Sequence, residues 1–226
     1  MNHLRSALRA RPNRLDRPIT AGVDRPARWR ARTTTVVRAM LAYIFWHRPY
    51  PTTERQRYEQ AIVRFQNDLA GSKPPGFIGA TSFQIEAVPW LSDLPGYEDW
   101  YLLDGTWAMD PLNAFAISGH VQAPHDGVAA MMEQGHGGLY AHAGGESMPA
   151  PRSTIHWLTR PRGIQWQPAI EAVRGSCPQA KAWRRQIVLG PAAEFAVETP
   201  AEAEIDVPAG WQRRRVMRMR LPHPLA

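Results

Sequence analysis

Two stretches of this chain match each other across a fixed offset of 112 residues. Phe45-Trp46-His47-Arg48-Pro49 aligns with Trp157-Leu158-Thr159-Arg160-Pro161, and without a gap Phe83-Gln84-Ile85-Glu86 aligns with Phe195-Ala196-Val197-Glu198. From position 48 to 86, seven of the 39 aligned positions are identical, where about 6% identity is expected by chance. The match indicates one supersecondary unit used twice, with coincidence as the alternative.

The pattern of apolar residues predicts a full unit in the first copy. Its first helix carries apolar side chains on one stripe, at spacings of three and four: Tyr58, Ala61, Ile62, Phe65 and Leu69. Further helices are expected to begin near Asp110 and Asp126. The predicted strands are the apolar or alternating runs 41–47, 77–88, 97–103 and 139–143, and the glycine-rich residues 135–138 are expected to be flexible.

In the second copy, the pattern predicts strands at 154–159, 185–197 and 211–221 and a helix at 164–173. No final helix and strand are predicted for this copy. The predicted fold class is therefore α+β, with two ferredoxin-like βαββ(αβ) units in tandem and the second one degenerate. The expected domains are a disordered basic tail (1–39), a first ferredoxin-like unit (40–146) and a second, truncated unit (152–226).

The net charge of +7 comes from one end of the chain. Residues 1–39 hold ten Arg and two acids, whereas residues 40–226 hold 17 basic and 18 acidic residues. The body is close to neutral, so charge supports nucleic-acid binding for the tail alone. The tail has three alternative interpretations. It is a disordered arm that binds polyanions, a transit-like peptide, or a segment upstream of the residue at which translation starts, Met40.

Composition excludes several classes of protein. The sequence has no apolar run of about 18 residues, so no membrane helix is predicted. The single Cys177 excludes an internal disulfide and an all-cysteine metal site, and it agrees with a cytoplasmic location. Dinucleotide-binding, P-loop, zinc-finger and Gly-x-Ser-x-Gly motifs are absent.

The order strand, helix, strand, strand, helix, strand over residues 40–146 is that of a ferredoxin-like unit. The chain is expected to hold two such units, marked by the repeated Arg48-Pro49 and Arg160-Pro161. This arrangement resembles the dimeric α/β-barrel superfamily, in which two sheets face each other. Chlorite dismutase-like proteins are a fused version of that architecture, and antibiotic-biosynthesis-monooxygenase proteins are the single-unit version. The resemblance covers roughly residues 40–221. It implies a fold but no catalytic residue, because no catalytic motif of these families matches.

Aromatic residues concentrate at the predicted strands, and nine Trp is a high number for 226 residues. We expect the packed sheets to enclose an apolar, Trp-lined cavity, in which Trp46, Trp100 and Trp157 bind a ligand. The alternative is that these residues form ordinary core.

Three polar residues near these tryptophans are the candidate catalytic residues. His47 follows Trp46 and can serve as a general base, because imidazole titrates near neutral pH. Tyr101 and Glu86 lie on neighbouring predicted strands and are the candidate partners of His47. Thr159 replaces His47 in the second copy, so the site is expected in one copy only.

Four of the eight histidines fall within 23 residues: His120, His125, His136 and His142. Imidazoles in such a group bind zinc, iron or copper, and one of them could hold a haem. Their spacing matches no known motif, and solvated loop histidines are the alternative. The cofactor is thus unknown: haem, a transition metal, or none.

Together these observations predict a soluble protein that binds a small apolar molecule, with an oxygenase- or isomerase-like enzyme as one form of it. The first alternative is a non-catalytic structural or interaction module whose apolar sheet face mediates homo-oligomerisation. The second is a haem or metal protein that uses residues 120–142. The sequence leaves open whether the protein is catalytic.

Overall fold

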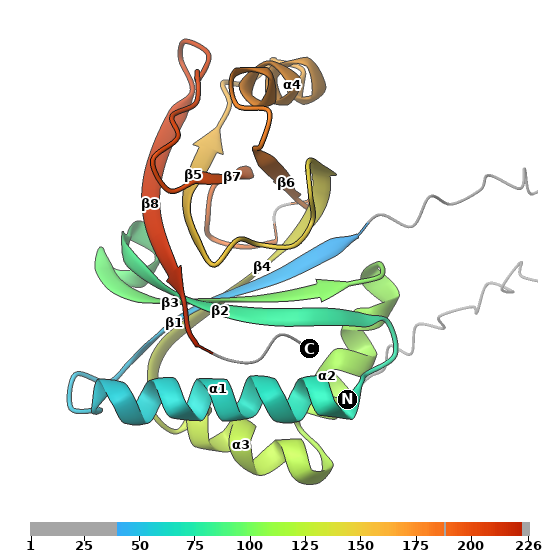
Figure 1. Ribbon diagram of the computed structural model, residues 1–226, viewed down its shortest axis with the longest axis vertical. Coiled ribbons are helices and arrows are strands. Elements are labelled where there is room, and N and C mark those ends of the chain that lie inside the picture. Colours follow the sequence, from blue (N-terminus) through green and yellow to red (C-terminus); the bar gives the residue numbers. More distant parts are fainter. Residues whose placement is uncertain (1–39, 188, 223–226) are drawn as a thin grey trace, which may run out of the picture. The chain divides into compact units, whose positions relative to one another are not determined.

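The computed structural model describes residues 40–187 and 189–222, in which eight strands close into one antiparallel barrel (Figure 1). The strands are β1 (Leu41–Pro49), β2 (Phe77–Val88), β3 (Leu94–Leu103), β4 (Met132–Gly144), β5 (Arg152–Thr159), β6 (Lys181–Arg185), β7 (Phe195–Pro200) and β8 (Gln212–Arg220). The ring order is β1-β3-β2-β8-β5-β7-β6-β4. The predicted tail, residues 1–39, lies outside the described residues, so its interpretations stay predictions.

Helices cover the outer face of the barrel. The helices are α1 (Arg55–Ser72), α2 (Met109–Ala116), α3 (Gly119–Ala129) and α4 (Trp166–Ser176), with short 3-10 turns η1 (Pro89–Leu91) and η2 (Thr106–Ala108). In Figure 1, α1, α2 and α3 lie on one side of the first four strands, and α4 lies against the second four. None of the described helices is long and apolar enough to cross a membrane.

The predicted α+β class is confirmed, and the two halves of the chain repeat one strand order. Around the ring, the first four strands follow the order β4-β1-β3-β2 and the last four follow the order β8-β5-β7-β6. Strands β1, β2, β3 and β4 thus correspond in place to β5, β6, β7 and β8. The prediction that the second copy lacks a final strand is wrong, since β8 fills that place. What this half lacks among the described residues is a helix between β7 and β8.

Two predicted element boundaries are also wrong. The predicted strand 185–197 is two strands, β6 and β7, because Gly190-Pro191 interrupts it and Pro cannot donate to a strand ladder. The glycines at 135–138, expected to be flexible, lie inside β4 and pair with β1.

The gapless alignment at offset 112 does not superpose the two halves. It places Phe45 on Trp157, yet Phe45 faces the helices and Trp157 faces the barrel interior. Side chains alternate along a strand, so a slip of one residue reverses every one of them. The same offset pairs β2 with β7, which hold different places in the ring.

Aromatic rings fill the barrel interior. The largest side chains there are less than 2% exposed: Trp46, Trp100, Trp157, Trp183 and Tyr140. They meet edge to face, with ring centroids 5.4 Å apart for Trp46 and Trp157 and for Trp100 and Trp183, a favourable arrangement for aromatic pairs. The two halves of the barrel therefore bury the apolar side chains of their inner faces against each other.

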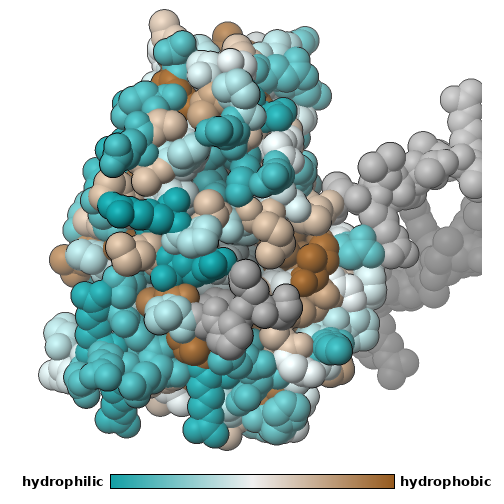
Figure 2. All heavy atoms as spheres, viewed as in Figure 1, coloured by the Kyte–Doolittle hydropathy of each residue, from teal (hydrophilic) through white to brown (hydrophobic). Residues whose placement is uncertain are grey.

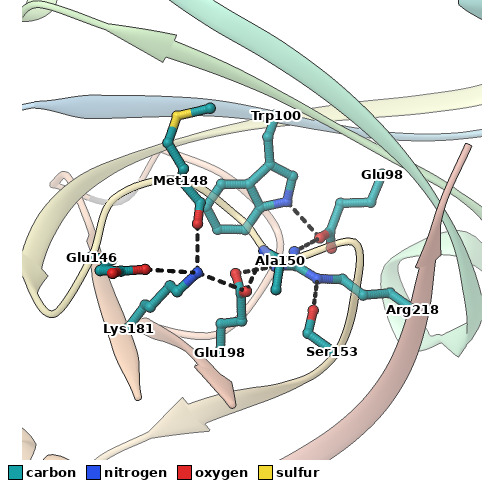
Figure 3. Close-up of polar contacts among 9 residues, drawn as sticks. All are labelled: Glu98, Trp100, Glu146, Met148, Ala150, Ser153, Lys181, Glu198 and Arg218. Carbon is teal, nitrogen blue, oxygen red and sulfur yellow. Dashed lines mark hydrogen bonds and ion pairs between the residues drawn. The ribbon is translucent and has the colours of Figure 1, made fainter. Parts of the chain in front are cut away.

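A buried charged group joins the two halves inside this core (Figure 3). Arg218 on β8 donates through Nη1 to Glu98 Oε1 on β3 at 2.7 Å, and through Nη2 to Glu198 on β7. Its Nε donates to Ser153 Oγ at 2.9 Å. Its guanidinium carbon lies 4.1 Å from the ring centre of Phe83. Each charge is thus paired or stacked, as a buried charge must be.

Replacing Arg218 by Met is expected to lower the free energy of unfolding by about 3–5 kcal/mol, because Glu98 and Glu198 would stay buried without a counter-charge. Urea denaturation measures the change. Arg213→Met is the control, since Arg213 pairs with an exposed Glu204 and should change the same quantity by less than about 1 kcal/mol. Equal effects of the two substitutions would contradict this account of the barrel core.

A second prediction concerns His156 on β5, which is fully buried. Burial, and then the charge of Arg213, lowers the pKa of His156 to about 4, while Glu204 opposes this and Arg215 adds to it. The unfolded chain binds this proton near pH 6.5, so the folded state loses stability as pH falls from about 6.5 to about 4, by up to about 3 kcal/mol.

His156→Gln should remove this part of the acid sensitivity. Urea denaturation between pH 4 and 7 measures it, with His120→Gln as the control, since His120 is exposed on α3. The same pH dependence in His156→Gln and in the original protein would refute the assignment.

Candidate functional site

A cavity of about 250 Å³ lies between the outer face of β1 and β3 and the helices α1, α2 and α3. Its walls are mostly apolar and come from both layers: Tyr43, Phe45, Ile62, Phe65, Leu69, Leu112, Val128 and Met132. Five more polar side chains line it: His47, Asp99, Tyr101, Asn113 and His125. A mostly apolar pocket with a few convergent polar groups is typical of small-molecule sites.

Strand alternation brings the polar groups together. Phe45 pairs with Asp99, and His47 with Tyr97, where β1 and β3 run antiparallel. His47 and Asp99 therefore lie on the same outer face of the sheet, and their side chains meet diagonally across the two strands. His47 Nε2 lies 3.2 Å from Asp99 Oδ2, and both residues are buried.

Two tyrosines hold this pair from either side. The Tyr58 hydroxyl of α1 lies 2.6 Å from His47 Nδ1, and the Tyr101 hydroxyl donates to Asp99 Oδ2 at 3.2 Å. Gln66 of α1 donates through Nε2 to the Tyr101 oxygen at 3.1 Å. The imidazole and the carboxylate are thus fixed by the first helix and by their own sheet.

The tyrosines of the site stay neutral. Burial, and then the Asp99 charge, raises the pKa of Tyr58 and of Tyr101 well above its usual value. The same two causes, in the same order, raise the pKa of Tyr43. These phenols therefore act as hydrogen-bond donors to the charged and basic groups beside them.

Two buried polar atoms of the site have no hydrogen-bond partner among the described residues: Asp99 Oδ1, and His47 Nε2, whose 3.2 Å contact with Asp99 Oδ2 lacks hydrogen-bond geometry. Leaving such an atom unpaired in a protein interior costs about 1–3 kcal/mol. Both residues line the cavity, so these atoms are the candidate contacts for a molecule bound there. The site thus combines one acceptor and one imidazole nitrogen with a mostly apolar space.

The structure brings together two of the three candidate catalytic residues. His47 and Tyr101 both contact Asp99, as described above. Glu86 does not join them: it is exposed near the end of β2, and its Oε2 accepts from the backbone N–H of Met217 at 3.0 Å.

The three candidate ligand-binding tryptophans lie on the other side of the sheet from this cavity. Trp46 and Trp100 point into the barrel, and both indole N–H groups donate to Glu98, at 2.8 and 2.6 Å. Trp157 packs on Trp46 in the same interior. The expected Trp-lined cavity between the sheets is therefore not the one observed. The observed cavity lies under the helices, and its aromatic lining residues are Tyr and Phe.

The four histidines proposed as metal ligands are placed apart. His120 contacts Ser72, His125 contacts Asp126, His136 contacts Gln134, and the ring of His142 packs on Trp183. Within residues 40–187 and 189–222, no group of three or more His, Cys, Asp or Glu side chains is placed to hold a metal ion.

Haem, which the sequence left open as a cofactor, does not fit the helix-side cavity. The 250 Å³ of this cavity is below the range of about 300–1,000 Å³ that is usual for drug-sized ligands, and a haem macrocycle needs a large pocket. A smaller molecule fits better.

Asp99 and Tyr58 were missed by sequence reasoning. Tyr97, Asp99 and Tyr101 alternate along one strand, so a carboxylate between two tyrosines on one face was a usable signal. Tyr58 was assigned to the buried stripe of its helix, which is confirmed, but a stripe does not show that a hydroxyl reaches a histidine on another element.

No protein-family model matches this chain, and no curated protein matches it. Two similar solved structures are proposed monooxygenases. The one from Fusobacterium nucleatum has 8% identity, a TM-score of 0.53, and coverage of 82% of this chain and 94% of its own. The one from Lactobacillus acidophilus has 8% identity, a TM-score of 0.52, and coverage of 83% and 96%.

A mutant chlorite dismutase from Candidatus Nitrospira defluvii is also similar, with 8% identity, a TM-score of 0.48, and coverage of 80% of this chain and 91% of its own. The two proposed monooxygenases establish a shared fold, since their identity is too low to show shared chemistry. The resemblance seen in the sequence is thus confirmed at the level of the fold.

Glycines of β4 make room for the cavity wall. A Cβ atom on Gly137 would lie 2.6 Å from the Tyr43 hydroxyl oxygen, and one on Gly135 would lie 2.6 Å from Phe45 Cζ. Both rings line the cavity, so they can lie across β4 only because these positions carry no side chain.

Gly137→Ala should therefore push Tyr43 toward the cavity and lower the free energy of unfolding by about 1–3 kcal/mol, the usual cost of overpacking. Urea denaturation and a crystal structure of the variant measure both effects. Gly79→Ala is the control, since nothing lies within 4 Å of a Cβ at Gly79. An unmoved Tyr43 ring would show that the glycine does not shape this wall.

Proposed function

We propose that the helix-side cavity binds a small ring-containing ketone and that Asp99 and His47 transfer a proton at the carbon beside its carbonyl. The observation that supports this most directly is the pair of buried atoms without a hydrogen-bond partner, Asp99 Oδ1 and His47 Nε2, on two residues that line a mostly apolar cavity. A carbonyl with an acidic C–H beside it satisfies both atoms at once.

The tautomer of His47 decides which role each atom takes. Tyr58 is a neutral phenol 2.6 Å from Nδ1, and a negative carboxylate lies 3.2 Å from Nε2. A carboxylate favours a proton on the nitrogen that faces it, and the phenol can donate to the other nitrogen. We therefore assign the imidazole proton to Nε2, which makes this atom a donor.

The proton transfer then follows from the positions of these atoms. Asp99 Oδ1 takes the proton from the carbon beside the carbonyl; the electron pair of the C–H bond forms the C=C bond of the enolate, and the π pair of the carbonyl moves onto its oxygen. His47 Nε2–H donates to that oxygen as its negative charge develops. Return of the proton to the same or another carbon gives the original ketone or an isomer.

The surroundings support this chemistry. The Tyr101 hydroxyl holds Asp99 Oδ2, so Oδ1 is the oxygen left for the substrate. The apolar walls exclude water, which strengthens the interactions of the few polar groups inside. An enolate is also the electron-rich form of a substrate that reacts with O2, which agrees with an oxygenase-like activity such as that named for the two similar structures.

We also infer that the two halves are ferredoxin-like units in tandem. Both halves show the same strand order, and Glu98 and Glu198 hold equivalent places around Arg218. His156 pairs with Val197 as His47 pairs with Tyr97. The residue after Glu198 is Thr199, however, so the second unit has no carboxylate where the first has Asp99, and one site per chain follows.

The interaction-module alternative and homo-oligomerisation stay predictions. On the face shown in Figure 2, hydrophobic side chains lie in small groups among hydrophilic ones. This view gives no support to a broad apolar interface on that face.

Hydrogen–deuterium exchange at the acidic CH2 of 2-tetralone, followed by proton NMR in D2O, tests the proposed function. We expect the protein to catalyse the exchange and Asp99→Asn to slow it by about 100-fold or more, the usual contribution of a general base. Calorimetric titration should show that Asp99→Asn still binds the ketone.

Glu86→Gln is the matched control for this experiment, because it removes a carboxylate outside the cavity and should leave the exchange rate unchanged. Exchange by Asp99→Asn at the original rate would refute the role of Asp99. No exchange at all by the original protein would refute the proposed proton transfer.

A further inference from the structure

The two described residues after β8, Leu221 and Pro222, follow this strand where it pairs with β2 of the first half. Leu221 directly follows β8, and its backbone N–H donates to the carbonyl of Ser82 on β2 at 2.8 Å. The ladder between β2 and β8 is short, from Phe83↔Arg220 to Ile85↔Arg218. Leu221 thus extends a narrow contact between the two halves.

The side chain of Leu221 is buried in a small apolar cluster with Tyr58, Ile62 and Tyr97. Two members of this cluster also hold His47. The Tyr97 ring stacks on the imidazole at 5.6 Å between centroids, and Tyr58 meets it edge-on at the same distance while its hydroxyl contacts Nδ1. A residue from the end of the second half therefore shares one buried apolar cluster with both rings that position His47.

Leu221 is buried, whereas the next residue, Pro222, lines a groove at the surface. A surface groove lined by Glu59, Val63 and Pro222 lies on the neighbouring part of α1, whereas Tyr58 is fully buried. With a smaller side chain at 221, water could reach the Tyr58 hydroxyl and compete with His47 Nδ1 for it. The Tyr58 ring would also lose a packing partner that restricts its rotamer.

We propose that Leu221 is a positioning residue of the site: it holds Tyr58 against His47 Nδ1 and so keeps the imidazole proton on Nε2. The inference rests on the proposed function for the use of that proton, but the tautomer itself can be measured without a ligand. The second half of the chain thereby completes a site whose catalytic residues come from the first half.

The first experiment compares Leu221→Ala with Leu221→Met and with Met219→Ala, an exposed position two residues earlier on β8. Nitrogen-15 NMR of protein labelled at histidine, without ligand, reports the tautomer of His47, and the signal is assigned by its loss in His47→Gln. We expect a protonated Nε2 in the original protein, in Leu221→Met and in Met219→Ala. In Leu221→Ala the two ring-nitrogen shifts should move toward each other as the tautomers mix.

The second experiment uses 2-tetralone exchange. Leu221→Ala should lower the turnover number about tenfold or more with KM changed by less than about twofold, because the substrate still binds but the donor is no longer held. Leu221→Met should restore the rate. A merely structural role would lower the amount of folded protein and leave the turnover number of the folded fraction unchanged.

Original nitrogen shifts of His47 in Leu221→Ala would overturn the proposal. If this variant fails to fold, Leu221→Val, which removes less of the side chain, is measured in the same way and should show the same change in smaller degree. If the original protein exchanges no 2-tetralone, the proposed function fails, while the ligand-free nitrogen shifts still decide the role of Leu221.

Discussion

The contact of Arg218 with Glu98 and Glu198 links the closure of the barrel to the geometry of the site. Glu98 and Asp99 are neighbours on β3, and successive side chains of a strand point to opposite faces. The alternation that turns Glu98 inward to Arg218 therefore turns Asp99 outward to His47. One strand thus serves the buried charge cluster on one face and the cavity on the other.

Element order and residue type were predictable from the sequence, whereas the contacts between elements were not. The apolar stripe of α1 and the period-two runs depend on local spacing, so they predicted the α+β class and most strands. His47 and Tyr101 were candidates because one follows a tryptophan and the other lies on a neighbouring predicted strand, and both line the cavity. The alternation of Tyr97, Asp99 and Tyr101 places Asp99 on a face, but its position beside His47 depends on the register between β1 and β3, which no single strand contains.

The internal repeat also shows that a sequence match does not reveal which face of a strand a residue lies on. The sequence match found the right pair of first strands, β1 and β5, but it placed Phe45 on Trp157 and so reversed the faces. Counting identities treats neighbouring residues as equal, whereas a sheet separates them into an interior and an exterior set. The three-dimensional equivalence of Glu98 with Glu198 could be recognised only through the arginine that both contact.

The two places where the halves meet are narrow. The β2–β8 ladder covers only Phe83–Ile85 on the β2 side, and the β4–β6 ladder is irregular after His142. Cutting the backbone at 145–151, between β4 and β5, would break no strand ladder inside either half. Most of the backbone pairing therefore lies within each half, and closure of the barrel depends largely on side chains such as Arg218, so a core substitution can loosen the barrel while each half keeps its strand pairing.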